Sequence, residues 1–370
     1  MRPATLTREI YRDIRGRQTT PRSNDEHLSA AMSWLYRSQD VTGVGGSAAY
    51  YSLLTGWAGP YLETSGYIIP TLYDYAAYTN ADEPRERAEQ MAMWLLDGQF
   101  DHGAFPGGVG LQTDSDPSVF NTGQILFGLV EAYRQTSDER FLSAVERAGD
   151  WLIDVQHPDG YWDNFDYRGE RHSYCSRVAW ALLEAAELTG NGTFREGAVA
   201  HLDWVVSVQT ERDWFEYAGF SPDERPYLHT LAYTVRGLLE CGLWLDDDTL
   251  ISAARKTADR LLDCQQRTDV LLGEYDRRWN GSEFYCLTGN AQTALVWLRL
   301  YEQYREKRYL TAADTELAFL KQHHNLTGPA AVRGAVRGSV PVWERYMRLR
   351  YPNWAVKFLC DALLLRARLQ

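Results

Sequence analysis

The chain has 370 residues, 45% of them hydrophobic, and a formal net charge of −12. That apolar fraction is sufficient for a large buried core. The acidic balance argues against a nucleic-acid partner, which needs a basic stripe, and against a negatively charged membrane surface. No apolar run is long enough to cross a bilayer, so we expect no membrane insertion.

Residues 1–24 are polar and lack the apolar segment of a signal peptide, so we expect an extended or partly disordered N-terminal arm. The five cysteines are scattered and none forms a CxxC pair; they are Cys175, Cys241, Cys264, Cys286 and Cys360. An odd, scattered set predicts free thiols and favours a cytoplasmic location.

A short marker recurs along the chain: an aromatic residue or Leu, then Leu or Val, then three residues and Gln. It begins at residues 34, 94, 151, 204 and 261, ends at Gln39, Gln99, Gln156, Gln209 and Gln266, and has a degenerate sixth copy beginning at Phe319. Nearly equal spacing over the whole chain indicates an internal structural repeat.

Each marker closes a stretch with helical apolar spacing, such as residues 141–156 and 194–209. A polar or Gly-rich loop follows, and then a second helical stretch that is apolar nearly all round. These second stretches cover residues 64–79, 121–136, 174–190, 229–245, 289–304 and 353–368. Helices that are apolar all round belong in an inner ring, whereas the more charged first helices belong outside.

The two ends of the chain complement one another. The repeat opens with a lone outer helix at residues 25–39 and ends with a lone inner helix at residues 353–369. Pairing these two helices would seal a ring of six hairpins. We therefore predict an all-α (α/α)6 barrel formed as one domain by residues 1–370.

The loops after the Gln markers carry the unusual chemistry, and in such a toroid they gather on one face together with the inner-helix N-termini. His is a poor N-cap, yet His172 and His229 stand at inner-helix starts. The catalytic acid/base candidates are His229, Tyr285, His172 and Tyr233. The substrate-binding candidates are Glu63, Tyr67, Asn121, Trp162, Arg171, Tyr275, Arg277 and Trp279.

This set suits proton abstraction at C5 of a uronate within a glycan. Arg171, Arg277 and Asn121 would neutralise the sugar carboxylate and stabilise the enolate. A His or Tyr would supply base and acid, while Tyr67 and aromatic platforms stack on sugar rings. Elimination gives a polysaccharide lyase and reprotonation gives a C5-epimerase, and the two share their first step. Neither reaction calls for a metal or cofactor, and we expect none.

Two alternatives remain open. A glycoside hydrolase needs two carboxylates, and no spacing singles out a pair among Glu63, Asp101, Asp163, Asp166, Glu216, Asp276 and Glu283. A non-catalytic glycan-binding or assembly protein would use the same face to bind a sugar without turnover.

Residues 156–162, Gln-His-Pro-Asp-Gly-Tyr-Trp, resemble the Q-x-x-D-G-x-W repeat of squalene-cyclase and prenyltransferase-like toroids. The same signature occurs in (α/α)6 sugar enzymes such as unsaturated glucuronyl hydrolases. The resemblance implies a toroid and leaves the reaction open. Asp246-Asp247-Asp248 does not match the D-x-D-D acid motif of the cyclases, which disfavours terpenoid cyclisation.

Residues 273–277, Gly-Glu-Tyr-Asp-Arg, followed by Tyr285, resemble the C-terminal helical domain of heparosan glucuronyl C5-epimerases, with one residue fewer between Gly and Tyr. That resemblance implies roles on the uronate for Tyr275, Arg277 and Tyr285. The stretches 338–343 and 351–355 also resemble toroids associated with polysaccharide biosynthesis, which implies a glycan partner but no particular reaction.

Overall fold

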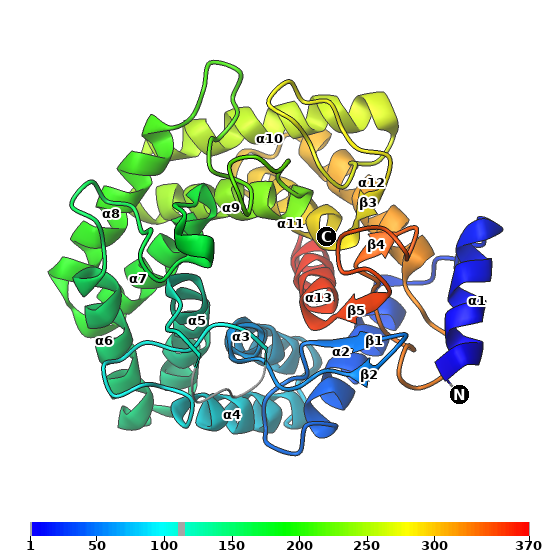
Figure 1. The fold of residues 1–370 in the computed structure, drawn as a ribbon, viewed down its shortest axis with the longest axis horizontal. Coiled ribbons are helices and arrows are strands. Elements are labelled where there is room, and N and C mark those ends of the chain that lie inside the picture. Colours follow the sequence, from blue (N-terminus) through cyan, green and yellow to red (C-terminus); the bar gives the residue numbers. More distant parts are fainter. Residues whose placement is uncertain (1, 110–114, 370) are drawn as a thin grey trace.

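In the computed structural model, which describes residues 2–109 and 115–369, the helices form a closed two-layered ring (Figure 1). The inner helices are α3 (Leu62–Thr79), α5 (Val119–Thr136), α7 (Ser176–Thr189), α9 (Leu228–Leu245), α11 (Leu287–Tyr304) and α13 (Asn353–Arg368). The outer helices are α2 (Asn24–Asp40), α4 (Glu83–Leu96), α6 (Glu139–Asp154), α8 (Gly192–Ser207), α10 (Asp248–Thr268) and α12 (Lys307–His323).

The ring closes as the sequence predicted. The C-terminal inner helix α13 packs against the N-terminal outer helix α2 and also against inner helix α3. Every other inner helix packs against the next inner helix and against the outer helix that follows it in the chain. The fold is therefore an all-α (α/α)6 toroid.

The recurring glutamine joins neighbouring hairpins. The Gln99 side-chain amide donates to the carbonyls of Gly103 and Ala144, both at 2.9 Å. The Gln156 amide does the same with Gly160 at 2.8 Å and Gly197 at 2.9 Å. In each case one acceptor belongs to the glutamine's own loop and the other to the next outer helix. The marker is thus a structural joint between successive repeats.

The fifth joint uses a different glutamine from the predicted one. Gln265 is buried and its amide donates to the Ala312 carbonyl at 3.1 Å and to Glu316 at 2.6 Å, whereas Gln266 is exposed. The marker read from the sequence ends at Gln266, at a fixed offset from Leu261, whereas the joint is formed by the residue before it. Outer helix α10 is longer than its counterparts, and its last turn presents the preceding residue to the ring.

Two glycines show why the loops beyond the glutamines are Gly-rich. Gly103 and Gly160 have φ angles of +98° and +90°, where side chains are strained. A Cβ at Gly103 would lie 2.1 Å from the Arg147 carbonyl oxygen, and one at Gly160 would lie 2.3 Å from that of Ala200. Gly160 is the glycine of the Asp-Gly signature, so that signature serves close packing.

Short strands fasten the loops on the mouth of the ring. A three-stranded antiparallel sheet has the order β2-β1-β5, from β2 (Gly56–Trp57), β1 (Tyr50–Ser52) and β5 (Arg350–Pro352). A second pair joins β3 (Tyr285–Cys286) to β4 (Ser339–Val340). Because β1 and β5 come from opposite ends of the chain, the first sheet strengthens the ring closure. Two 3-10 helices, η1 (Tyr167–Gly169) and η2 (Ser173–Cys175), precede α7.

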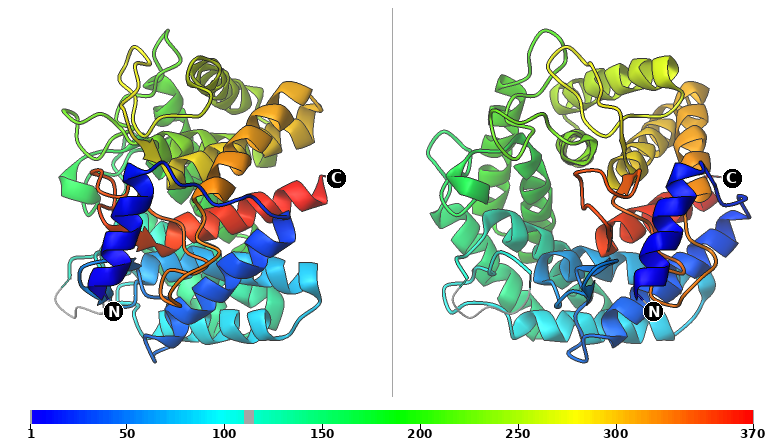
Figure 2. Two further views of the ribbon diagram at one scale, coloured as in Figure 1. Left: turned by 90° about the vertical axis from the view of Figure 1, so that its right-hand side faces the viewer. Right: turned by 45° about the vertical axis from the view of Figure 1, so that its right-hand side comes forward.

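The N-terminal arm is ordered, which corrects the expectation for residues 1–24. It contains helix α1 (Arg2–Ile14), which lies on the outside of the ring (Figure 2). Glu9 is buried and pairs at 2.7 Å with the fully buried Arg337. Asp13 pairs with the same guanidinium and accepts the Val342 N–H at 2.7 Å. Leu6 and Ile10 also pack against the core, so the arm is held by charged and apolar contacts together, and its mostly polar sequence concealed it.

The five cysteines are free and buried. Within the described ranges, no helix is both long and apolar enough to pass through a lipid bilayer.

Candidate active site

The mouth of the ring that carries the inner-helix N-termini opens into a cavity of about 1350 Å³, which we name the loop-side cavity. Its lining includes the first turns of α3, α5, α9 and α13 and the loops that precede them. This is the face on which the sequence placed the site. Aromatic side chains dominate the wall, and they include Tyr61, Tyr67, Phe120, Tyr174, Phe220, Tyr227, Tyr233, Tyr346 and Trp354.

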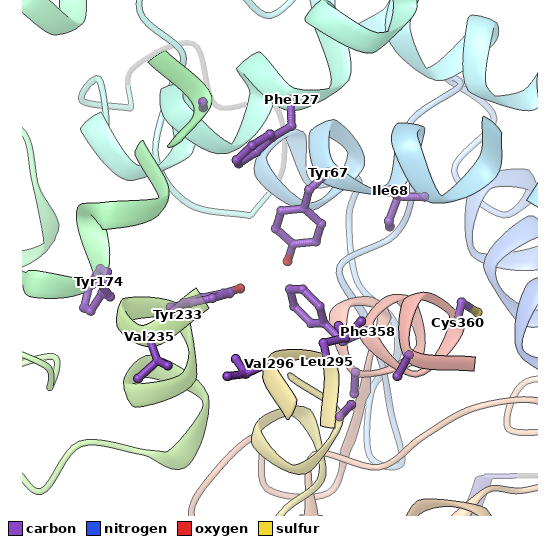
Figure 3. Packing of buried hydrophobic residues seen from close by; sticks show 14 of the residues in the cluster. Tyr67, Ile68, Phe127, Tyr174, Tyr233, Val235, Leu295, Val296, Phe358 and Cys360 are labelled. Carbon is purple, nitrogen blue, oxygen red and sulfur yellow. The ribbon is translucent and has the colours of Figure 1, made fainter. Parts of the chain in front are cut away.

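The floor of this cavity is a layer of aromatic rings. Tyr67 from α3, Tyr233 from α9 and Phe358 from α13 converge at the centre of the ring (Figure 3). The Phe358 ring centroid lies 5.7 Å from that of Tyr67 and 5.8 Å from that of Tyr233. We name these three side chains the aromatic layer. Each of the three is at most 4% exposed, so the layer seals the floor of the cavity and presents little open ring face.

Glu63, in the first turn of α3, is a carboxyl that lines the cavity together with Tyr61 and Tyr67. Its carboxylate accepts a hydrogen bond from the Tyr61 hydroxyl. Burial raises the pKa of Glu63 to about 7, although the Tyr61 hydrogen bond and the Arg177 guanidinium act in the lowering direction. A carboxyl with this pKa holds a proton near neutral pH and can donate it.

His229 begins α9 and faces the same cavity. Its ring lies 5.0 Å from the Tyr346 ring and 5.3 Å from the Tyr233 ring, and its Nδ1 has no hydrogen-bond partner among the described residues. Burial lowers the pKa of His229 to about 3, so the imidazole is neutral at pH 7. A neutral imidazole with so low a pKa is a poor proton acceptor, which weakens its predicted role as a base.

The pKa values of two tyrosines in the cavity also make them poor general bases. Burial raises the pKa of Tyr67 and of Tyr233 well above the ordinary phenol value, and the Arg177 cation offsets this only in part for Tyr233. Phenolates are therefore disfavoured here. Both hydroxyls suit hydrogen bonding to sugar oxygens better than removing a carbon-bound proton.

Cations stand at the rim. Arg168, Arg345 and Arg350 line the cavity and are largely exposed. Arg168 pairs with Glu224 at 3.2 Å, Arg345 pairs with Glu274, and the Arg350 guanidinium lies 4.8 Å from the centre of the Tyr50 ring. Two of the three are thus neutralised by glutamates, whereas Arg350 has no carboxylate partner among the described residues and is the best placed to meet an anionic ligand.

The other carboxyls of the lining are less suited to chemistry. Asp166 is buried and fully engaged: one oxygen contacts His172 Nδ1 at 3.0 Å and the Cys175 thiol at 3.0 Å, and the other accepts the Tyr167 N–H at 2.9 Å. Asp116 is exposed, and Asp163 is partly exposed and accepts the Asn164 N–H at 2.7 Å. Glu63 is thus the carboxyl best placed to donate a proton.

The structure brings five of the predicted site residues to the loop-side cavity: Glu63, Tyr67, Asn121, His229 and Tyr233. Asn121 is almost buried, and its side-chain amide donates to the Pro106 carbonyl at 2.9 Å. It therefore holds the loop before α5 and presents only a small surface to the cavity. His172 lies one layer behind, with its ring stacked at 4.5 Å on Tyr174, which itself lines the cavity.

Three predicted aromatic contacts with sugar are not supported. Trp162 is 0% exposed and donates its indole N–H to the Leu152 carbonyl, so no ring face is free. Tyr275 is 2% exposed, and its hydroxyl accepts the Leu272 N–H. Trp279 is 8% exposed, donates to the Arg212 carbonyl and packs edge-on against Trp214. Trp162 and Tyr275 are bonded within their own hairpins, whereas Trp279 is bonded to the loop between α8 and α9.

Tyr285, Arg171 and Arg277 also lie outside the cavity lining. Tyr285 sits in β3 with its ring 4.8 Å from Phe319. Arg171 stacks over the Tyr217 ring at 4.5 Å, and exposed Arg277 pairs with Glu216 at 2.6 Å. The predicted trio of His172, His229 and Tyr285 therefore does not meet at one place. His229 faces the cavity, His172 lies behind its wall, and Tyr285 is held in the β3–β4 pair.

Sequence reasoning missed much of the aromatic wall. Tyr61 and Tyr227 are the N-cap residues of α3 and α9, where neither offers a side-chain cap. An aromatic residue at equivalent inner-helix starts was a signal that the sequence contained. Tyr346 and Trp354 gave no such signal, since they reach the cavity from the last loop and from α13.

No protein-family model and no curated protein sequence matches the chain. Among solved structures, an unsaturated glucuronyl hydrolase specific for heparin superposes with a TM-score of 0.74 at 15% identity, covering 94% of this chain and 97% of that one. The unsaturated glucuronyl hydrolase of Bacillus sp. GL1 gives a TM-score of 0.73 at 17% identity, with 92% and 96% covered. The enzyme from Streptococcus agalactiae gives 0.68 at 15%, with 96% and 94% covered.

At these identities the similarity establishes the fold. It agrees with the resemblance to toroidal sugar enzymes. It gives no support to the resemblances to C5-epimerases or prenyltransferase-like toroids. The residues that carried the epimerase resemblance, Tyr275, Arg277 and Tyr285, are also those that lie away from the cavity.

Proposed function

We propose that the protein is a glycoside hydrolase that acts on a uronate-containing oligosaccharide, with Glu63 as the proton donor. The observation that carries this proposal is a comparison of two groups in the cavity: a carboxyl suited to donating a proton and an imidazole poorly suited to accepting one. Burial raises the pKa of Glu63 to about 7, while it lowers the pKa of His229 to about 3. Removing a proton from C5 requires a base, whereas cleaving a glycoside begins by donating a proton.

We therefore favour a hydrolase over a lyase or an epimerase. The bases predicted for a lyase or epimerase that line this cavity are His229 and Tyr233, and the pKa of each is shifted in the direction that disfavours base catalysis.

The similar structures suggest which oligosaccharide to test, because they are named as unsaturated glucuronyl hydrolases. An unsaturated uronate has a C4=C5 double bond next to its ring oxygen, which makes it an enol ether. Protonation at C4 leaves a cation at C5 that the ring oxygen shares, and water then adds at C5. The water returns a proton to the acid, the hemiketal opens, and the neighbouring sugar is released. One carboxyl that first gives and then regains a proton is sufficient.

The rest of the cavity supports an acidic sugar. Arg350 at the rim is placed to attract a carboxylate, and the aromatic wall offers flat surfaces for the pyranose ring. Water that enters with the ligand must reach the sugar beside Glu63, and the volume of about 1350 Å³ leaves room for more than one sugar unit.

Product analysis tests the proposal. The protein is incubated with unsaturated and with saturated uronate disaccharides. We expect new reducing ends, accompanied by loss of the double-bond ultraviolet absorbance when the unsaturated substrate is used. A gain of that absorbance would identify a lyase, and deuterium entering C5 without cleavage would identify an epimerase. Sugar binding with no turnover of either substrate would identify a glycan-binding protein, and any of these three results would overturn the proposal.

A further inference from the structure

A second cavity lies below the aromatic layer. It is lined by later turns of inner helices α3, α5, α7, α9, α11 and α13 and has a volume of about 380 Å³. We name it the far cavity. Tyr67 lines both cavities, so in places a single ring separates them. The loop-side cavity is walled by aromatic side chains, whereas the far cavity is rich in charge.

Most of the charge in the far cavity is internally paired. Glu240 lies between Arg236 and Arg299, with nitrogen–oxygen distances of 2.5 Å and 2.8 Å. Further pairs are Arg134 with Glu184 at 2.9 Å, Arg299 with Glu302, Arg368 with Asp74 at 2.7 Å, and Lys357 with Asp361. These charges neutralise one another and give no reason to expect a ligand.

Arg177, at the deep end of the far cavity, is different. It is 4% exposed, and no carboxylate of the described residues lies within ion-pair distance of it. Its one hydrogen bond is from Nε to Gln124 Oε1 at 2.8 Å. Aromatic rings hold the guanidinium, at 4.8 Å from the Tyr233 centroid and 5.2 Å from that of Phe127. Asp361 and Glu63 interact with it only at longer range. A buried cation with no carboxylate in contact is costly, and this one is positioned on the wall of an open space.

Two side-chain amides are also hydrogen-bond donors without an acceptor. The Nε2 atoms of Gln292, which lines the far cavity, and of Gln124, which faces Arg177, are buried without a hydrogen-bond partner in the described chain. The Gln124 amide cannot be turned over to satisfy itself, because its oxygen is taken by Arg177. Buried donors without partners are rare, and an acceptor-only ligand would satisfy them.

We infer that the far cavity is a binding site for a small oxyanion, such as a phosphate, sulfate or carboxylate group, held by Arg177 with Gln292. This site is separate from the proposed hydrolase site and does not depend on that function. The ligand would enter from the mouth opposite the substrate loops, past Arg134 and Arg368. Planar guanidinium donors suit all three groups, and the test distinguishes among them.

Calorimetric titration of the full chain with phosphate, sulfate and glucuronate measures the binding. We expect at least one to bind, and Arg177→Met to weaken that binding tenfold or more. Gln292→Leu should weaken it severalfold. Arg366→Met is the control, because it removes an inner-helix arginine, on α13, that pairs with Asp314 and does not line the cavity. The affinity of this variant should equal that of the unaltered protein.

A crystal soak of the unaltered protein with selenate locates the anion without any variant. The anomalous signal should lie beside Arg177. The inference is overturned if no probe binds, if selenate occupies only the loop-side cavity, or if Arg177→Met and Gln292→Leu bind as tightly as the control. Should Arg177→Met fail to fold, the soak and Gln292→Leu still decide.

Discussion

The two cavities of the ring are built from opposite ends of the same inner helices, yet they differ in how they treat polar groups. At the loop-side cavity, a carboxyl and an imidazole stand among aromatic rings, and burial shifts both toward their neutral forms. At the far cavity, acids and bases are packed as ion pairs: its two arginine partners help to lower the pKa of Glu240, although burial still raises that of Glu184 to about 7. A buried titratable group without an ion-pair partner has a shifted pKa and can take part in proton transfer. Groups in ion pairs instead hold the side chains around them in place. Glu63 is the proposed acid of the loop-side cavity, and Arg177 is the proposed anion-binding residue of the far cavity.

The largest expected effect is on Glu63. Replacing it with Gln keeps the shape and removes the proton, so kcat/KM for the cleaved uronate substrate should fall by about 10²–10⁴-fold. Glu283→Gln is the control, since Glu283 is exposed and does not line the cavity. Oxyanion binding in the far cavity should persist in Glu63→Gln. A variant that keeps more than a tenth of the activity would contradict the role of Glu63 as acid.

The second-largest effect is expected for the glutamines that join neighbouring repeats, because both cavities depend on the closed ring. Gln265→Ala removes a buried donor from the Ala312 carbonyl and from Glu316, and should lower the free energy of unfolding by about 1–3 kcal/mol. Gln266→Ala, one residue further along, should change it by less than about 0.5 kcal/mol. Urea denaturation measures both. Equal losses in the two variants would show that the fifth joint has been assigned to the wrong glutamine.

His229 should matter less than Glu63. The neutral imidazole can form one hydrogen bond with the sugar. Losing that bond in His229→Asn should lower kcat/KM about tenfold. Far-UV circular dichroism should be unchanged. Complete loss of activity with an intact fold would restore His229 as the base and with it the lyase or epimerase reading.

The pH profile gives the smallest and most specific effect. Glu63 must be protonated to act, so kcat/KM should decline as the pH rises above about 7. The Arg177 cation favours the carboxylate form and lowers this pKa, so Arg177→Met should keep Glu63 protonated to higher pH and move the alkaline limb upward. A limb that stays in place would show that the two cavities are electrostatically independent.

The sequence by itself determined the ring. Five markers at nearly equal spacing, with helices apolar all round alternating with amphipathic ones, specify six hairpins because each inner helix must be covered on both sides. The lone helices at the two ends then specify closure, and α2 and α13 do pair. The sequence also indicated the correct face, since the long loops all follow the markers.

Only the tertiary structure decided which side chains of those loops face inward. Trp162 and Tyr174 lie close together in sequence, yet Trp162 turns into its hairpin to reach the Leu152 carbonyl while Tyr174 lines the cavity. Loop residues have no periodicity that fixes their direction, so each one is placed by whichever backbone partner lies nearby. The reactivity of Glu63 follows from the same cause, because its pKa depends on rings contributed by distant helices.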